Sequence, residues 1–233
     1  MSQALELLPG GPGGRRTLAE TAAAELHQLI VSGELPSGTP LRLVDLAGRL
    51  EMSQMPVREG LRRLEALGLV DIIPHRGAWV RELSIEDLRD TQETRLALET
   101  LAVRAAAERF TEQDAVSARE ALQAQVKLAR AGDIVGARQA HTDFHFAIYR
   151  AGGSRWLTRA IEPVWQNSER YRFGNPQSPA RIGLHHKEHQ AILEACVAHD
   201  VQGAEAALRR HLDGATERIR AVMAGPRATK EER

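Results

Sequence analysis

The chain has 233 residues, of which 42% are apolar and only 4% aromatic, and its formal net charge is zero. This length is enough for one large or two small domains with a buried core, and an apolar fraction dominated by Ala and Leu favours helices over a sandwich or barrel. The zero net charge excludes a protein coated in positive charge, so a surface that binds nucleic acid must be a local patch.

Residues 15–82 have the order of elements of a winged helix-turn-helix. They follow a tail at 1–14 that we expect to be disordered, because it ends in PGGPGG. Helical patterns cover 17–31, 43–50 and 53–68, and two short β-type runs follow at 69–73 and 77–80. The third helix has Ser53 as a plausible N-cap and Gly68 as its stop signal, and the two β-type runs are typical of a hairpin. This order predicts a domain that binds double-stranded DNA.

The helix at 53–68 carries arginines away from its apolar side. At 100° per residue, Val57, Leu61 and Leu64 share the side that faces the core. An exposed Arg on such a helix reaches phosphates, or guanine in the major groove, and the hairpin tip is placed for the minor groove. The predicted DNA contacts are Ser53, Gln54, Met55, Arg58, Arg62, His75, Arg76 and Gly77. The alternative, a solvated Arg/Glu face, is disfavoured by the motif as a whole.

The wording SQMPVREGLRRLEALGLV at 53–70, followed by PHRGAWV at 74–80, resembles the DNA-binding domain of the GntR family of bacterial transcription regulators. The resemblance implies DNA contacts by Arg58, by the polar residues before it and by the hairpin. Gln54 and Met55 stand where family members often carry a small hydroxyl residue and Arg. This departure indicates a different base preference.

From residue 83 the pattern is helical almost to the end of the chain. Predicted helices cover 84–110, 111–131, 133–152, 154–173, 179–199 and 200–223, and Pro163 is expected to kink the fourth. Good N-cap residues mark the starts of five of them, namely Ser84, Thr111, Asp133, Ser154 and Asp200. Cys196, the one cysteine, excludes an intramolecular disulfide and a cysteine metal cage, and we expect it to be buried. The expected fold class is mainly α, with an N-terminal winged helix-turn-helix that has a small β hairpin (15–82), a C-terminal all-helical bundle (83–224) and a disordered tail (225–233).

Four histidines of the helical part are predicted to face one core. His141 and His145 are an i, i+4 pair on an apolar stripe, and His189 and His211 lie on the inward stripes of two further helices. Four imidazoles from three helices suit a divalent transition metal such as Zn²⁺ or Ni²⁺. The alternative is a set of satisfied core histidines, since His185 also lies on an inward stripe. The residues themselves leave both interpretations open.

Residues 85–222 resemble the all-helical FCD effector-binding domain of the FadR branch of the same family. The resemblance rests on RLALE at 95–99, FH at 144–145, EHQAIL at 188–193 and HL at 211–212. It implies a metal site whose ligands in family members are one Asp and three His, at the positions of His141, His145, His189 and His211. His141 stands in place of the Asp. Three histidines and one carboxylate leave one net positive charge on a dication, whereas four neutral imidazoles leave two. We therefore expect this site to hold anions more strongly than a site with an Asp ligand. If His141 does not ligate, a three-histidine site with more open positions remains.

Arg95 is the candidate residue for effector binding. It lies on the inward stripe of its helix, where the residues allow either an ion pair with Glu99 or a bidentate clamp for a carboxylate ligand. The resemblance favours the clamp, because FCD domains commonly bind small organic acids through the metal and an Arg. Trp165, Tyr171 and Arg172 are further candidates to line the same pocket, but the sequence does not fix their placement.

The two resemblances together cover about residues 17–222. They imply a homodimeric transcription regulator, expected to be a repressor, that binds a palindromic operator and responds to a small carboxylate at the metal site. One alternative is a regulator that senses zinc or nickel itself. A metal-dependent hydrolase is another, but we expect no enzyme, because the inward faces offer little beyond Glu99 as a base and no HExxH signature occurs. With neither a signal peptide nor a long uncharged apolar run, the chain is expected to be cytoplasmic, without a membrane partner.

Overall fold

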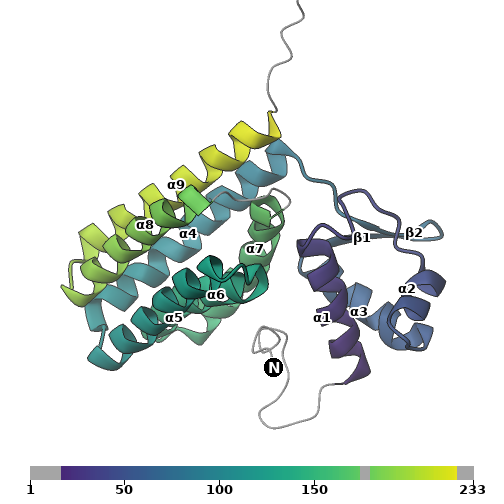
Figure 1. The fold of residues 1–233 in the computed structure, drawn as a ribbon, viewed down its shortest axis with the longest axis horizontal. Helices are drawn as coiled ribbons and strands as arrows, with labels where there is room; N and C mark the ends of the chain where they lie inside the picture. Colours follow the sequence, from purple (N-terminus) through teal and green to yellow (C-terminus); the bar gives the residue numbers. More distant parts are fainter. Residues whose placement is uncertain (1–16, 174–178, 225–233) are drawn as a thin grey trace, which may run out of the picture.

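The computed structural model describes residues 17–173 and 179–224, which form an N-terminal and a C-terminal region (Figure 1). The N-terminal region comprises α1 (Leu18–Val31), α2 (Leu43–Arg49), α3 (Gln54–Ala66), β1 (Val70–Ile73) and β2 (Gly77–Val80). The C-terminal region comprises α4 (Ile85–Arg109), α5 (Glu112–Arg130), α6 (Ile134–Ala151), α7 (Arg155–Phe173), α8 (Pro179–Val197) and α9 (Val201–Met223). The predicted mainly α class with one small hairpin is confirmed. The expected tails, 1–14 and 225–233, lie outside the described residues.

Helix α1 packs on α3 at close range. It begins with a capping box, in which Thr17 accepts from the backbone of Glu20 and the Glu20 carboxylate accepts from the backbone of Thr17. A Cβ at Gly60, in the middle of α3, would lie 2.9 Å from the backbone nitrogen of Ala23, so this contact requires glycine. Ser53 holds the N-cap position of α3, but its side chain makes no capping hydrogen bond. The predicted inward stripe is buried, as Val57, Leu61 and Leu64 show.

The hairpin pairs β1 and β2 in antiparallel register, with Ile73 opposite Gly77 at its tip. The tip requires a left-handed backbone at His75 (φ 61°) and at Gly77 (φ 116°). A third extended piece lies beside β2, where Pro40 forms a β-bridge with Trp79. The sequence did not predict this extended piece, because residues 35–40 (LPSGTP) have the composition of a loop. It brings the segment before α2 against the hairpin.

Helix α4 is the longest of the C-terminal region and contacts α6, α7, α8 and α9. Predicted N-cap side chains accept hydrogen bonds from the first turns of their helices, as seen for Ser84, Thr111, Asp133 and Asp200. Cys196 belongs to the apolar core between these helices and is fully buried, as predicted. Pro163 lies inside α7, and the kink that we expect there stays a prediction. Among the described residues, no helix combines the length and the apolar composition needed to cross a bilayer.

Two separate apolar cores divide the described chain. One is built from residues between Ala22 and Val80, and the other from residues between Ala102 and Leu212. The connection between β2 and α4 is only a few residues long. This separation supports a domain boundary near residue 82, which stays a prediction.

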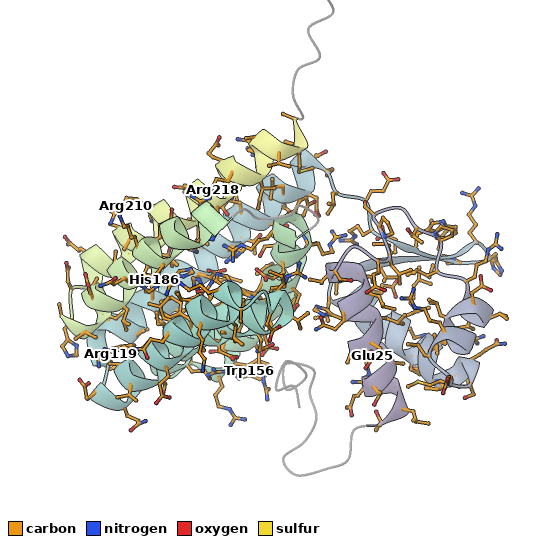
Figure 2. The ribbon with its side chains drawn as sticks, in the orientation of Figure 1. Glu25, Arg119, Trp156, His186, Arg210 and Arg218 are labelled. Carbon is orange, nitrogen blue, oxygen red and sulfur yellow. The ribbon has the colours of Figure 1, made fainter. Side chains whose placement is uncertain are left out.

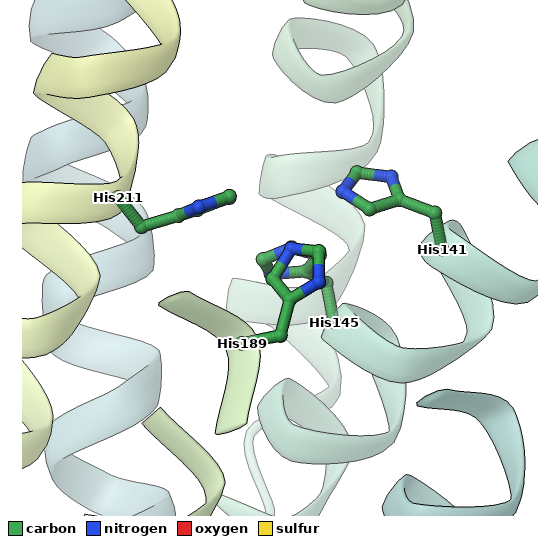
Figure 3. Close-up of side chains that lie close together, drawn as sticks. All are labelled: His141, His145, His189 and His211. Carbon is green, nitrogen blue, oxygen red and sulfur yellow. The ribbon is translucent and has the colours of Figure 1, made fainter. Parts of the chain in front are cut away.

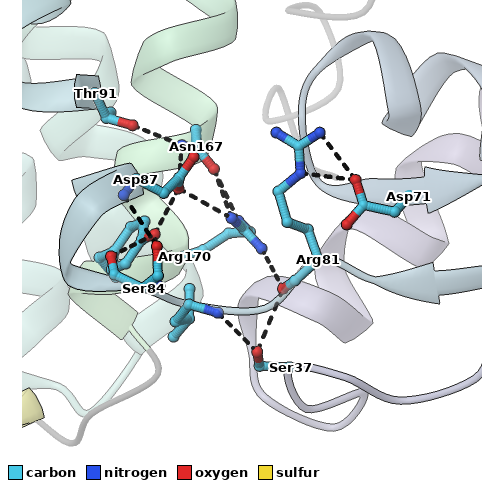
Figure 4. Close-up of polar contacts among 10 residues, drawn as sticks. Ser37, Asp71, Arg81, Ser84, Asp87, Thr91, Asn167 and Arg170 are labelled. Atoms are coloured by element: carbon cyan, nitrogen blue, oxygen red, sulfur yellow. Dashed lines mark hydrogen bonds and ion pairs between the residues drawn. The ribbon is translucent and has the colours of Figure 1, made fainter. Parts of the chain in front are cut away.

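Polar groups of α7 connect the two regions (Figure 4). Arg170 donates from Nη1 to the carbonyl of Arg81 (2.7 Å) and from Nη2 to the amide oxygen of Asn167 (2.7 Å). About one turn before Arg170 in α7, the Gln166 side chain accepts a hydrogen bond from Nε2 of His27 in α1 (2.6 Å). Helix α7 is therefore attached both to the segment that follows the hairpin and to α1.

Candidate metal centre and nucleic-acid interface

Four histidines from three helices meet in the core of the C-terminal region (Figure 3). His141 and His145 come from α6, His189 from α8 and His211 from α9, and each is at most 2% exposed. One ligand nitrogen from each ring lies within 4.8 Å of all the others. The structure thus brings together the four residues that the sequence singled out. Their binding of a metal stays a prediction.

Neighbouring polar groups orient two of the four rings. Nδ1 of His211 donates to a carboxylate oxygen of Glu188 (2.8 Å). The phenol of Tyr149 donates to Glu99 (2.5 Å) and therefore accepts from Nδ1 of His145 (3.2 Å). In both rings the proton lies on Nδ1, so the lone pair of Nε2 faces the cluster.

The donor set fits a divalent transition metal. Nε2 of His211, on the side of the ring that faces the cluster, is buried and meets no hydrogen-bond partner among the described residues, a condition that a bound metal ion would relieve. Burial lowers the pKa of all four histidines well below the usual value of 6.5, and repulsion from Arg172 lowers it further. The rings are therefore neutral at neutral pH, which is the form that ligates Zn²⁺ or Ni²⁺.

Arg95 makes the ion pair that the sequence allowed. Its Nε and Nη2 donate to the two carboxylate oxygens of Glu99, at 2.5 and 3.2 Å, and both side chains are buried. The guanidinium also lies over the ring of Trp165, 4.7 Å from the centroid. Trp165 in turn stacks on His141, with 5.3 Å between the ring centroids. Arg95 is thus held at the wall of the histidine cluster, and its role in effector binding stays a prediction.

Arg172 contacts the cluster directly, a placement that the sequence alone did not fix. Its Nη1 lies 2.5 Å from Nε2 and 3.0 Å from Nδ1 of His141. It also pairs with Glu169, one turn earlier in α7, at 3.6 Å. Tyr171 lies elsewhere, with its hydroxyl on the backbone at the start of α4. The signal for Arg172 is the i, i+4, i+7 spacing that puts Trp165, Glu169 and Arg172 on one side of α7.

The residues predicted to contact DNA are all exposed, namely Ser53, Gln54, Met55, Arg58, Arg62, His75, Arg76 and Gly77. Arg58 and Arg62 of α3 and Arg76 of the hairpin line one groove together with Arg42. The sequence did not single out Arg42, because it lies outside the arginine-bearing helix and is brought there by the extended piece beside β2. Glu59 pairs with Arg62 at 3.0 Å and compensates part of its charge. The groove is a local positive patch in a chain of zero net charge.

Comparisons with known proteins agree with this architecture. Residues 18–80 match the family described as bacterial regulatory proteins, gntR family, and residues 90–214 match the FCD domain. The chain is 33% identical to the probable D-xylose utilization operon transcriptional repressor of Paenarthrobacter nicotinovorans over 202 residues, which cover 85% of this chain and 88% of that protein. It is 32% identical to the HTH-type transcriptional regulator BphR of Paraburkholderia xenovorans, over 88% of this chain and 86% of that one. Among solved structures, E. coli McbR/YncC is similar with a TM-score of 0.79 at 25% identity, over 90% of this chain and 100% of that one.

Proposed function

The chain belongs to the GntR family of bacterial regulatory proteins, with an FCD domain in its C-terminal part, and from this premise we propose that a small organic acid, bound at a metal site, controls its binding to DNA. As a member of this family it is a DNA-binding transcriptional regulator and not an enzyme. Several similar proteins are named as repressors, and we propose repression for this chain. We assign DNA binding to residues 15–82 and effector binding to residues 83–224.

The convergence of four buried imidazoles, with Nε2 of His211 lacking a hydrogen-bond partner within the part of the chain that the structure describes, is the observation that carries the metal site. The proposed ligands of a zinc or nickel ion are His141, His145, His189 and His211. When bound, the metal supplies a Lewis-acidic position for a carboxylate oxygen of the effector. Glu188 and Tyr149 keep two of the rings turned with Nε2 toward that position.

We propose that Arg95 orients a carboxylate of the effector. Glu99 and the ring of Trp165 hold its guanidinium beside the cluster. A guanidinium binds a carboxylate through two parallel N–H groups, so an acid here would compete with Glu99 for Arg95. Effector binding would therefore loosen the Arg95–Glu99 pair. Tyr149 donates to Glu99 and accepts from His145, so it connects this pair to a candidate metal ligand.

We propose that the eight exposed residues of α3 and the hairpin read the operator, with Arg42 as an additional contact. One groove lined by four arginines supplies few phosphate contacts. Two such grooves, presented by a homodimer, would double them and would match a palindromic operator.

Helix α7 is the proposed connection between the two sites. One side of it places Trp165 and Arg172 at the histidine cluster. Two other side chains of α7, Gln166 and Arg170, form hydrogen bonds with the N-terminal region. A shift of α7 on ligand binding would move the DNA-binding domain and change the spacing of the two DNA-reading surfaces in the dimer.

The first experiment measures metal content by plasma mass spectrometry on untagged protein purified without chelator. About one zinc or nickel ion per chain is expected, as for a single four-ligand site. His189→Ala should lose the metal. His186→Ala is the matched control, because His186 lies three residues earlier in α8 and lines a different pocket. Equal metal in the wild type and in His189→Ala, or none in the wild type after incubation with both ions, would contradict the proposal.

A regulator that senses the metal itself is the second candidate. The donor set favours it in one respect, because four histidines would occupy all the positions of an ion that takes four ligands and would leave none for an acid. Operator binding by the metal-loaded protein separates the two candidates. If zinc or nickel alone changes operator affinity and carboxylic acids change it no further, the metal is the signal. If the loaded protein responds only to an added acid, the acid is the signal.

A further inference from the structure

The guanidinium of Arg172 lies against the ring of His141, at the edge of the histidine cluster. Nη1 lies 2.5 Å from Nε2 and 3.0 Å from Nδ1, so the acceptor nitrogen of the ring lies near Arg172 in either tautomer. The Arg172 side chain is 9% exposed, and that of Glu169, with which it pairs, is 8% exposed. A buried cation therefore contacts the ring whose lone pair a metal ion would need.

A metal ion and Arg172 cannot use that lone pair at the same time. A neutral imidazole has one acceptor nitrogen, and a guanidinium offers only donors and keeps its charge. If His141 becomes a ligand, Arg172 must release the ring, and repulsion between like charges drives the guanidinium away from the ion. Its backbone in α7 and its partner Glu169 keep it near the cluster, where an anion bound to the metal ion would meet its positive charge.

The charges around the cluster indicate which anion fits. Buried or half-buried arginines and glutamates form pairs there, namely Arg95 with Glu99, Arg172 with Glu169 and Arg218 with Glu188. Among these three pairs of described residues the charges cancel, and neutral imidazoles add none, so the three pairs leave both charges of a bound dication uncompensated. A monocarboxylate compensates one of them, whereas a dicarboxylate compensates both.

We propose that Arg172 is a second recognition residue for the effector and that the effector is a dicarboxylic acid. One carboxylate would lie at the metal ion held by the histidines. Arg172 would move away from His141 and bind the other carboxylate. This inference rests on the proposed function, because it assumes the metal site. It makes a specific claim about one side chain: Arg172 opposes metal binding and favours dicarboxylate binding.

The test uses Co²⁺ as a spectroscopic metal probe, and succinate and acetate as probes of the two anion classes. Calorimetry of the Co²⁺-loaded protein gives the affinity for each acid, and chelator competition gives the affinity for Co²⁺. Arg172→Gln removes the guanidinium, and Arg172→Gln with Glu169→Gln removes the pair without a net change in charge. Arg172→Lys keeps the positive charge but loses the two parallel N–H groups that bind a carboxylate. Arg210→Gln is the control, because Arg210 is exposed on α9 (Figure 2).

We expect the wild type to bind succinate more tightly than acetate. Arg172→Gln and the charge-balanced double variant should weaken succinate binding about 10- to 100-fold, the range for loss of a charge-assisted hydrogen bond, and leave acetate nearly unchanged. Both should bind Co²⁺ at least as tightly as the wild type, with a visible spectrum that still reports nitrogen ligands. Arg172→Lys should be intermediate for succinate, and Arg210→Gln should match the wild type. Melting temperatures establish that each variant is folded.

Each contrary outcome has a distinct meaning. Wild-type succinate affinity in both Arg172→Gln variants, with Co²⁺ bound, overturns the role of Arg172 and leaves the metal site standing. Equal affinity of the wild type for acetate and succinate overturns the dicarboxylate class. Co²⁺ binding that depends on His189, with neither acid bound, overturns this inference in favour of metal sensing. No Co²⁺ binding at all overturns the proposed metal site together with the inference.

Discussion

Glu188 orients His211 from the neighbouring helix, with its Oε2 2.8 Å from Nδ1 of the imidazole. Arg218 donates two hydrogen bonds to the same carboxylate, at 3.0 and 3.1 Å, so Glu188 is itself fixed in place. Glu188 precedes His189 in α8. One helix therefore supplies a candidate ligand and also the group that turns the ligand from α9 toward it.

Glu188→Gln is expected to weaken metal binding while leaving all four histidines in place. The amide keeps an acceptor for Nδ1 but removes the negative charge that raises the basicity of Nε2, and changes of this kind lower metal affinity about 10- to 100-fold. Chelator competition with the purified protein measures the change. Glu194→Gln is the matched control, because Glu194 lies on the same helix but is exposed. Equal metal affinity in the two variants would show that His211 needs no carboxylate partner, or does not ligate.

The helices and the histidine cluster could be predicted because local signals specify them. N-cap residues such as Thr111 and Asp200 mark helix starts, and their side chains accept the expected hydrogen bonds. The spacing of His141 and His145 fixes the side of α6 on which they lie, and that side is buried. Periodicity within one helix thus predicts which residues face the core, and a core of six helices leaves these histidines few places to lie.

The polar groups around the cluster could not be predicted in the same way, because they depend on how helices pack against one another. Tyr149 meets Glu99 from a different helix, across 50 residues of sequence. Arg172 reaches His141 across 31 residues, and nothing in the sequence sets the rotation of α7 against α6. The interpretation of Arg95 stayed open for the same reason: the sequence allowed both roles, and the structure shows the ion pair with Glu99.

Arg58→Ala is expected to weaken operator binding about 10- to 100-fold, the range for loss of a hydrogen bond to a charged group. Arg58 is exposed in the arginine-lined groove between α3 and the hairpin, so its removal should leave the fold and the melting temperature unchanged. Fluorescence anisotropy measures the affinity, with an operator selected from random DNA by the wild-type protein. Arg119→Ala, in α5 of the other region, removes the same charge and should have little effect. Wild-type affinity of Arg58→Ala at physiological salt would exclude this residue from the interface.

Cys196 is expected to be unreactive toward Ellman's reagent in the folded protein. The side chain is fully buried, and burial raises the pKa of its thiol to about 12. At pH 8 only about one thiol in ten thousand would be ionised, and the thiolate is the form that reacts. Full reaction of one thiol per chain should follow addition of guanidinium chloride. Rapid reaction of the native protein would mean that the core around α8 opens readily.

Arg170→Gln is expected to separate ligand binding from the response to it. Arg170 donates to the carbonyl of Arg81 and to Asn167, so it ties α7 to the segment that leads into the DNA-binding domain (Figure 4). It lies among neither the candidate metal ligands nor the DNA-reading residues, so the affinities for metal and for operator should stay close to those of the wild type. Allosteric coupling is typically about 5- to 150-fold in affinity, and in Arg170→Gln the change in operator affinity caused by the acid should fall to about 2-fold.

The measurement is the operator dissociation constant of the metal-loaded variant, with and without saturating succinate as the probe acid. Arg150→Gln is the control, because Arg150 is exposed near the end of α6 and removal of its charge should leave the full response. A full response in Arg170→Gln would place the coupling elsewhere, and the contact between His27 and Gln166 would then be the next to alter. Loss of operator binding in the absence of acid would instead show that the α7 contact holds the DNA-binding domain in its competent position. A lost response changes only the dissociation constant measured with acid, whereas lost support of the domain changes the constant measured without acid. One pair of titrations therefore decides whether Arg170 transmits the signal or only supports the DNA-binding domain.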